Sequence, residues 1–115
     1  MNNYQLAQNL NTSAELLDEV AKDDDIITLL MVANHVNTSS DTLDKLSHIK
    51  DSGLRMLIAQ NHNTSPETLE RLLFGNIDLF ICRCLYGNPN TPNHIKCYTL
   101  YLNYLNLLPQ DLNWL

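Results

Sequence analysis

The chain has 115 residues, of which 44% are hydrophobic and 17% are charged. These values are ordinary for a soluble globular protein, and the length suits one domain with its own core, so residues 1–115 are predicted to form a single domain. The formal net charge of −6 disfavours nucleic acid as a direct ligand, because phosphate backbones are bound by basic patches.

Targeting and membrane signals are not visible in the sequence. No basic, apolar segment precedes Lys22, and the longest apolar stretch, residues 26–33, is far shorter than the roughly 20 residues that span a bilayer. A cytoplasmic protein that does not enter a membrane is therefore expected.

One phrase, Asn-Thr-Ser, recurs along the chain. It occupies residues 11–13, 37–39 and 63–65, and a fourth copy, Asn-Thr-Pro, occupies residues 90–92, so the intervals are 26, 26 and 27 residues. Self-similarity with such a period is typical of stacked helical repeats. The sequence predicts an all-α protein built as an α-solenoid of about four helix-turn-helix repeats.

Each copy of the phrase has the composition of a helix start. In the first three copies the threonine is followed three residues later by a carboxylate, at Glu15, Asp41 and Glu67, a pattern that predicts a capping box with the threonine as N-cap. Apolar residues follow in the same register in all three units: Leu17, Leu43 and Leu69, then Val20, Leu46 and Leu72. We expect these i, i+3 pairs, and the alanines that end the preceding helices (Ala7, Ala33 and Ala59), to face one core.

The expected elements follow in chain order. Residues 1–8 form a short leading helix that caps the first repeat. The three regular repeats, 9–33, 34–59 and 60–86, contain helices over 13–22 and 26–34, 39–48 and 52–60, and 65–74 and 78–86. Gly75 and Gly87 are predicted helix C-caps. Residues 87–115 form an atypical fourth repeat and C-terminal cap, with a longer helix over 92–106.

Residues 59–72, Ala-Gln-Asn-His-Asn-Thr-Ser-Pro-Glu-Thr-Leu-Glu-Arg-Leu, and the turn 88–92, Asn-Pro-Asn-Thr-Pro, resemble the leucine-rich repeat variant family. The resemblance covers roughly residues 6–96. It implies a right-handed superhelix of stacked helices, similar to armadillo and HEAT arrays, and no single activity. Only Asn88-Pro89 keeps the Asn-Pro of the family, only Arg55 matches the arginine usual in its second helix, and no catalytic residue is implied.

Candidate residues for chemistry are few. Cys82 and Cys84 lie two residues apart, so on a helix they project about 200° from each other and share no metal. With Cys97 the number of cysteines is odd, which disfavours a disulfide framework. The four histidines lack metal-ligand or general-base spacing and are interpreted as polar residues of turns and helix ends: His35, His48, His62 and His94. The sequence predicts no enzyme, no metal and no cofactor.

Two surface features suggest a partner. All the net charge lies in residues 1–51, and stacking would align Asp18, Asp44 and Glu70 about 8–10 Å apart, the usual distance between packed helices. Near them in the sequence lie further acids: Glu19, Asp23, Asp24 and Asp25. These seven acids form either a solvated face or a binding face. Tyr101 and Trp114, near the C-terminus, form either part of a cap or a partner contact.

The predicted function is therefore non-catalytic protein binding, with a basic protein as partner. The most concrete version is a small acidic inhibitor, of the immunity or antitoxin type, that covers the phosphate-binding cleft of a basic nuclease-like toxin. The alternative is a structural scaffold or homo-oligomerising repeat module that docks through its tyrosine-rich C-terminal end. A monomer is favoured.

Overall fold

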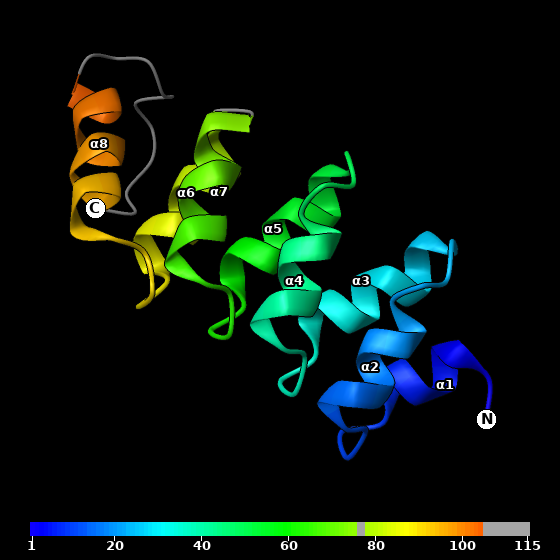
Figure 1. The fold of residues 1–115 in the computed structure, drawn as a ribbon. Coiled ribbons are helices and arrows are strands. Elements are labelled where there is room, and N and C mark those ends of the chain that lie inside the picture. The colour runs from blue at the N-terminus through cyan, green and yellow to red at the C-terminus, as the bar shows by residue number, and fades with distance from the viewer. Residues whose placement is uncertain (76–77, 105–115) are drawn as a thin grey trace.

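The computed structural model describes residues 1–75 and 78–104, and this part of the chain is all-helical, with eight α-helices and no strand (Figure 1). The all-α prediction is confirmed. In chain order the helices are α1 (Asn3–Gln8), α2 (Ala14–Val20), α3 (Ile26–Asn34), α4 (Ser40–Leu46), α5 (Ser52–Gln60), α6 (Pro66–Gly75), α7 (Leu79–Gly87) and α8 (Asn93–Tyr104). Among the described residues, no helix is long and apolar enough to cross a membrane.

The helices follow one another in pairs along the long axis of the molecule, with α1 and α8 near opposite ends (Figure 1). The molecule measures 49 × 22 × 22 Å along its principal axes. Helices α1, α3, α5 and α7 pack against one another in a row, and each also contacts the helix that follows it in the chain. Elements far apart in sequence therefore meet at a regular interval of about one repeat.

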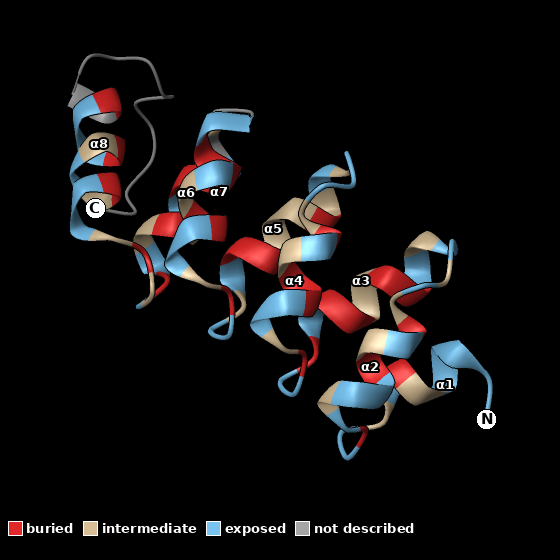
Figure 2. Ribbon diagram, in the orientation of Figure 1, coloured by how far each residue is buried: buried red, intermediate tan, exposed pale blue. Residues whose placement is uncertain are grey.

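The core runs along the molecule, because the successive helices each have buried residues (Figure 2). Its repeated members are fully or almost fully buried: Leu17, Leu43, Leu69, Val20, Leu46, Leu72, Ala7, Ala33 and Ala59. The three alanines lie in α1, α3 and α5, the helices that pack side by side, and a small side chain permits this close approach. The assignment of these residues to the core is confirmed.

The capping-box prediction was wrong, because the turn threonines do not cap the helices that follow them. The N-caps of α2, α4 and α6 are instead the serines one residue later; Ser13 accepts a hydrogen bond from the backbone N–H of Leu16 at 3.2 Å. Each threonine hydroxyl points back and donates to a carbonyl six residues earlier, as Thr38 does to Val32 at 2.6 Å. This carbonyl belongs to the last turn of the preceding helix and also accepts from the N–H of the C-cap residue, as Val32 does from His35 at 3.1 Å.

Side chains at the turns also join each repeat to the one before it. The amide of Asn61 donates to the carbonyls of Ala33 and His35 at 2.9 and 3.1 Å, and its oxygen accepts from the N–H of Asn63 at 2.9 Å. Asn88 makes the same three bonds one repeat later. These side chains satisfy turn carbonyls that the helices leave open.

His35 occupies the equivalent position in the preceding turn. Its Nδ1 accepts from the N–H of Asn37 at 3.0 Å, so Nε2 carries the hydrogen and donates to the carbonyl of Asn9 at 2.7 Å. The histidine is therefore buried and reproduces most of the asparagine bonds. The interpretation of His35 as a polar turn residue holds, and its bonding partners explain why it lies inside.

The fourth turn departs from the other three. The hydroxyl of Thr91 is buried without a hydrogen bond in the described part of the chain, whereas Thr12, Thr38 and Thr64 all donate to carbonyls.

The prediction of Gly87 as C-cap was wrong. Gly87 is the last residue of α7, and the cap is Asn88 in extended conformation, with φ −85°. A cap of this kind needs no left-handed residue.

Candidate functional site: polar contacts and an acidic groove between repeats

The acids predicted to form a column lie at equivalent positions of α2, α4 and α6, and each of them faces the next repeat. Asp18 reaches α4, Asp44 reaches α6, and Glu70 lies 3.5 Å from Nε2 of His94 on α8. The alignment expected from the sequence is therefore present. The three acids contact residues within the protein, a pairing that was not predicted from the sequence.

Asp18 and Asp44 have the same two kinds of partner. The Oδ1 atom of Asp18 accepts from the hydroxyl of Thr42 at 2.7 Å and from the ammonium of Lys45 at 3.1 Å. The hydrogen bond from Thr42, and next the one from Lys45, hold the pKa of Asp18 below its ordinary value. One carboxylate thus joins two neighbouring helices that α3 separates in sequence.

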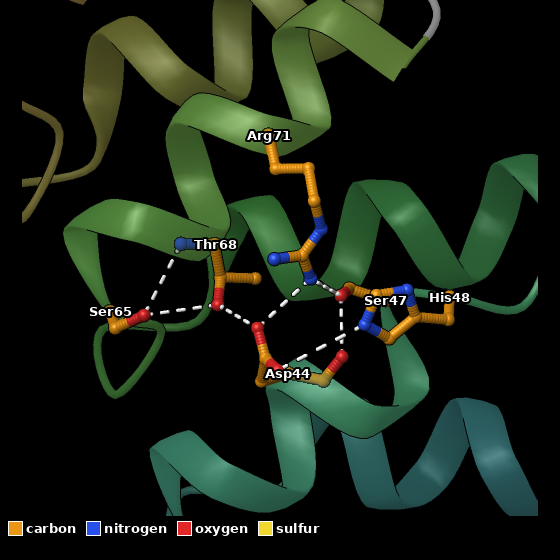
Figure 3. Close-up of polar contacts among 6 residues, drawn as sticks. All are labelled: Asp44, Ser47, His48, Ser65, Thr68 and Arg71. Carbon is orange, nitrogen blue, oxygen red and sulfur yellow. Dashed lines mark hydrogen bonds and ion pairs between the residues drawn. The ribbon is translucent and has the colours of Figure 1, made fainter.

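Figure 3 shows the second copy of this arrangement, between α4 and α6. Asp44 Oδ1 accepts from the hydroxyl of Thr68 at 2.6 Å and from Nη2 of Arg71 at 2.9 Å, and the same nitrogen donates to the hydroxyl of Ser47. His48 lies 4.0 Å from the other carboxylate oxygen. The bond from Thr68, and next the one from Arg71, lower the pKa of Asp44.

A sequence signal for these contacts exists. Each aspartate is followed 24 residues later by a threonine and 27 residues later by a base, as in Asp44, Thr68 and Arg71. The position equivalent to Thr42 and Thr68 is occupied by Leu16 one repeat earlier and by Ile95 one repeat later, so both ends of the chain lack this signal. The threonines therefore distinguish the two inner repeats from the ends.

We expect replacement of Asp44 by Asn to lower the free energy of unfolding by about 1 kcal/mol near neutral pH, and by much less in acid. The folded-state pKa of Asp44 lies below the unfolded value of about 3.9, so the folded protein binds fewer protons between those two values. The stability that Asp44 contributes is thus present above the unfolded pKa and is lost as the pH falls through the folded pKa. Urea unfolding at about pH 7 and about pH 2.5 measures this difference.

Asp41→Asn is the matched control, since Asp41 lies on the same helix, is exposed, and makes no ion pair with another described residue. An equal loss for Asp44→Asn at both pH values would show that the pairing with Thr68 and Arg71 contributes no charge-dependent stability.

A groove with a volume of about 380 Å³ opens between α2 and α4. Its walls carry four carboxylates and one ammonium group: Glu15, Asp18, Glu19, Asp41 and Lys45. Lys45 is paired with Asp18, and Glu19 is paired with Lys22 at 2.9 Å. Glu15 and Asp41 make no ion pair with a residue that the structure describes, and both are exposed. The groove therefore presents uncompensated negative charge to solvent.

Glu15 and Asp41 were not among the predicted partner residues, because the sequence assigned them to capping boxes. Serine is the N-cap, so each acid is the second helical residue and not the third. From this position its carboxylate does not form the capping-box bond to the backbone N–H of the N-cap. Both still lie in the first turn, where the helix dipole favours negative charge. Only the location of the cap shows that these carboxylates face outward.

The acids of the α2–α3 loop have local roles. Asp25 is the N-cap of α3 and accepts from the N–H of Thr28 at 3.3 Å. Asp23 accepts from the amide of Asn3 at 2.9 Å and from the N–H of Asp25, and the bond from Asn3 is the main reason why the pKa of Asp23 is lowered. Asp24 is exposed beside them. Two of the three predicted partner residues in this loop thus also stabilise it.

The aromatic candidates lie at the other end of the molecule. Tyr101 is 55% exposed on α8, and Trp114 lies outside the described residues. Tyr98 is half-buried and stacks obliquely on Phe74, with ring centroids 5.8 Å apart. Tyr98 thus belongs partly to the packing of α8 on α6, whereas Tyr101 is available at the surface.

The described residues contain no group of three or more histidine, cysteine or acidic side chains that could hold a metal ion. The three cysteines are free thiols, and burial, followed by the charge of Asp78, raises the pKa of Cys82 to about 11. Burial also raises the pKa of Cys84. Such thiols remain protonated near neutral pH and are poor nucleophiles.

The histidine interpretation needs one correction: His48 and His94 do have carboxylate neighbours, Asp44 and Glu70.

No family model, curated protein or solved structure matches the chain.

Proposed function

We propose that this protein is a non-catalytic helical-repeat module, an α-solenoid with a right-handed superhelix similar to the leucine-rich repeat variant family, that binds a basic protein. The hydrogen bonds that recur at each turn support the repeat interpretation, because residues 25–29 positions apart make the same contacts in successive units. A repeat array presents an extended surface whose target depends on its side chains.

The acidic groove between α2 and α4 is the observation that favours a basic partner. Four of its charged wall residues are acids, and Glu15 and Asp41 make no ion pair with a described residue. A lysine or arginine side chain of a partner fits such a groove, since it would supply the positive charge that the protein itself does not. Clustered negative charge would also accelerate the encounter with a cationic surface.

The narrower proposal is an inhibitor of the immunity or antitoxin type. A nuclease-like toxin binds phosphates in a basic cleft, and a small acidic protein can occupy such a cleft in place of the nucleic acid. The net charge of −6 supports this version. Capture of partners on the tagged protein from its native cell, followed by mass spectrometry, identifies the partner class directly.

We expect Asp41→Lys to slow association with the captured basic partner about three- to tenfold at low salt, with a smaller effect at high salt, because exposed charges act mainly on the encounter and are screened by ions. Stopped-flow association rates at two salt concentrations measure this effect. A labelled penta-lysine peptide serves as a simpler probe and should bind the variant more weakly.

Glu67→Lys is the matched control, because Glu67 is the equivalent first-turn acid of α6 and lies outside the groove. The two variants carry the same change in net charge and the same disturbance of a helix N-terminus. Equal slowing by both would mean that only net charge matters, and unchanged rates for Asp41→Lys in a folded protein would remove the groove from the proposal.

The scaffold alternative is supported by one observation. Phe74 and Tyr101 are 58% and 55% exposed near the C-terminal end of the described chain, and exposed aromatic side chains are common contact residues. Sedimentation of the purified protein over a range of concentrations distinguishes the two proposals. Self-association that Tyr101→Ala abolishes would favour the scaffold.

A further inference from the structure

A second groove, larger than the one between α2 and α4, has the opposite charge. Its volume is about 560 Å³, and it lies where the α4–α5 loop meets α5 and α6. Its lining includes three permanently cationic side chains and one histidine: Lys50, Arg55, Arg71 and His48. For a chain with only seven lysines and arginines and a net charge of −6, this is a concentrated basic patch.

The cationic side chains of this groove differ in their exposure and in their bonds to other residues of the protein. Arg55 is only 11% exposed and donates to the carbonyl of Leu72, so it forms part of the floor. Arg71 pairs with Asp44 on one side, as Figure 3 shows, and lies 43% exposed. Lys50 is exposed and makes no ion pair with any residue that the structure describes. Positive charge therefore faces the open side of the groove.

The one carboxylate in the lining does not cancel this charge at the surface. Asp51 is the N-cap of α5 and accepts from the N–H of Leu54 at 2.9 Å, which directs its oxygens to the helix end. Asp78, the other acid near the floor, lies 3.7 Å from Arg55 and is the N-cap of α7. Both acids thus have fixed partners inside the protein.

A comparison of equivalent loops shows that the basic patch is specific to one repeat. The α2–α3 loop has Asp24 where the α4–α5 loop has Lys50, 26 residues later, and it has Lys22 and Asp23 where the second loop has His48 and Ile49. The backbone role is the same in both loops, because the last residue of each, Asp25 or Asp51, caps the next helix. The difference in charge is therefore not required by the fold.

We propose that this basic groove binds an acidic peptide segment, rich in Asp or Glu, of a partner protein. One or two carboxylate side chains would enter between Lys50, which is exposed, and Arg71, whose side chain is 43% exposed beside its pairing with Asp44. The site is separate from the acidic groove and does not depend on it. A partner that engages both grooves would carry one basic and one acidic patch, and the two grooves would fix its orientation.

An acidic peptide fits the observations better than a nucleic acid does. The groove has room for a few side chains only, and the acidic residues of α2 and α4 would repel a polyanion that extended along the surface. A short acidic segment places its charge at one point and needs no long basic track.

The test uses fluorescein-labelled penta-glutamate, penta-serine and phosphoserine-containing peptides with the full chain at low salt, measured by fluorescence anisotropy. We expect penta-glutamate to bind and penta-serine not to bind. Lys50→Glu should weaken the binding of penta-glutamate about tenfold, since it both removes a positive charge and adds a negative one beside the ligand.

Lys96→Glu is the control, because Lys96 lies on α8 outside the groove and the change in net charge is the same. Binding that Lys50→Glu loses and Lys96→Glu keeps supports the site. Equal weakening by both variants, no binding of penta-glutamate, or binding of the phosphopeptide alone would overturn it. Because the acidic groove is tested with penta-lysine and Asp41→Lys, failure of one proposal does not affect the other.

Discussion

Leu69→Ala is expected to lower the free energy of unfolding by about 2–5 kcal/mol, and Leu43→Ala by a similar amount, because both side chains are fully buried. Leu43 lies on α4 and Leu69 on α6, in the middle of the molecule, where the space left by truncation is enclosed by neighbouring helices. In the proposed repeat array adjacent units stabilise one another, so loss of the middle unit should destabilise both sides. Denaturant unfolding followed by circular dichroism measures the effect.

The matched control is Leu16→Ala, which removes the same atoms from a leucine that is 39% exposed at the start of α2. Its effect should remain below about 1 kcal/mol, because most surface substitutions change stability little. If Leu43→Ala and Leu69→Ala also cost less than about 1 kcal/mol, these leucines would not form the core and the burial described above would be wrong.

The second large effect is expected at His35. Replacement by Ala removes the bonds of the buried His35 ring to the carbonyl of Asn9 and the N–H of Asn37 and leaves a cavity, which together should cost about 2–3 kcal/mol. Replacement by Asn should cost less than about 1 kcal/mol. Asn61 and Asn88 occupy the equivalent place in the next two turns and make the same kinds of bond.

Thermal and urea unfolding of the three proteins distinguish the bonding role from simple filling of space. Alanine and asparagine are both smaller than histidine, so a role limited to packing would make both variants similarly unstable. Equal losses for His35→Ala and His35→Asn would therefore contradict the hydrogen-bonded link between repeats.

Much of the local structure could be predicted because it depends on side chains close in sequence. The helices over residues 26–34 and 52–60 begin and end where the sequence places them, and an aspartate before each satisfies the first turn. The spacing of Leu17 and Val20, repeated 26 residues later, identifies the buried face, since only one helix face can carry an i, i+3 apolar pair into a core.

Assignments within the Asn-Thr-Ser phrase were less reliable. Threonine and serine are both acceptable N-caps, so the sequence alone does not distinguish a cap at Thr38 from one at Ser39. The choice depends on the preceding helix, whose last carbonyls lie close enough to accept from the threonine hydroxyl. The same shift by one residue moved Glu15 and Asp41 from predicted capping roles to the wall of a groove.

The sequence by itself determined the all-helical class and the core face, because these depend on periodicity and on contacts within a few residues. Only the tertiary structure decided which acids are paired and which face solvent. The sequence placed Asp18 on an acidic surface and Asp41 in a capping box, but stacking brings Thr42 and Lys45 to Asp18 and leaves Asp41 exposed. Pairing across a repeat depends on the distance and rotation between helices, which local patterns do not contain.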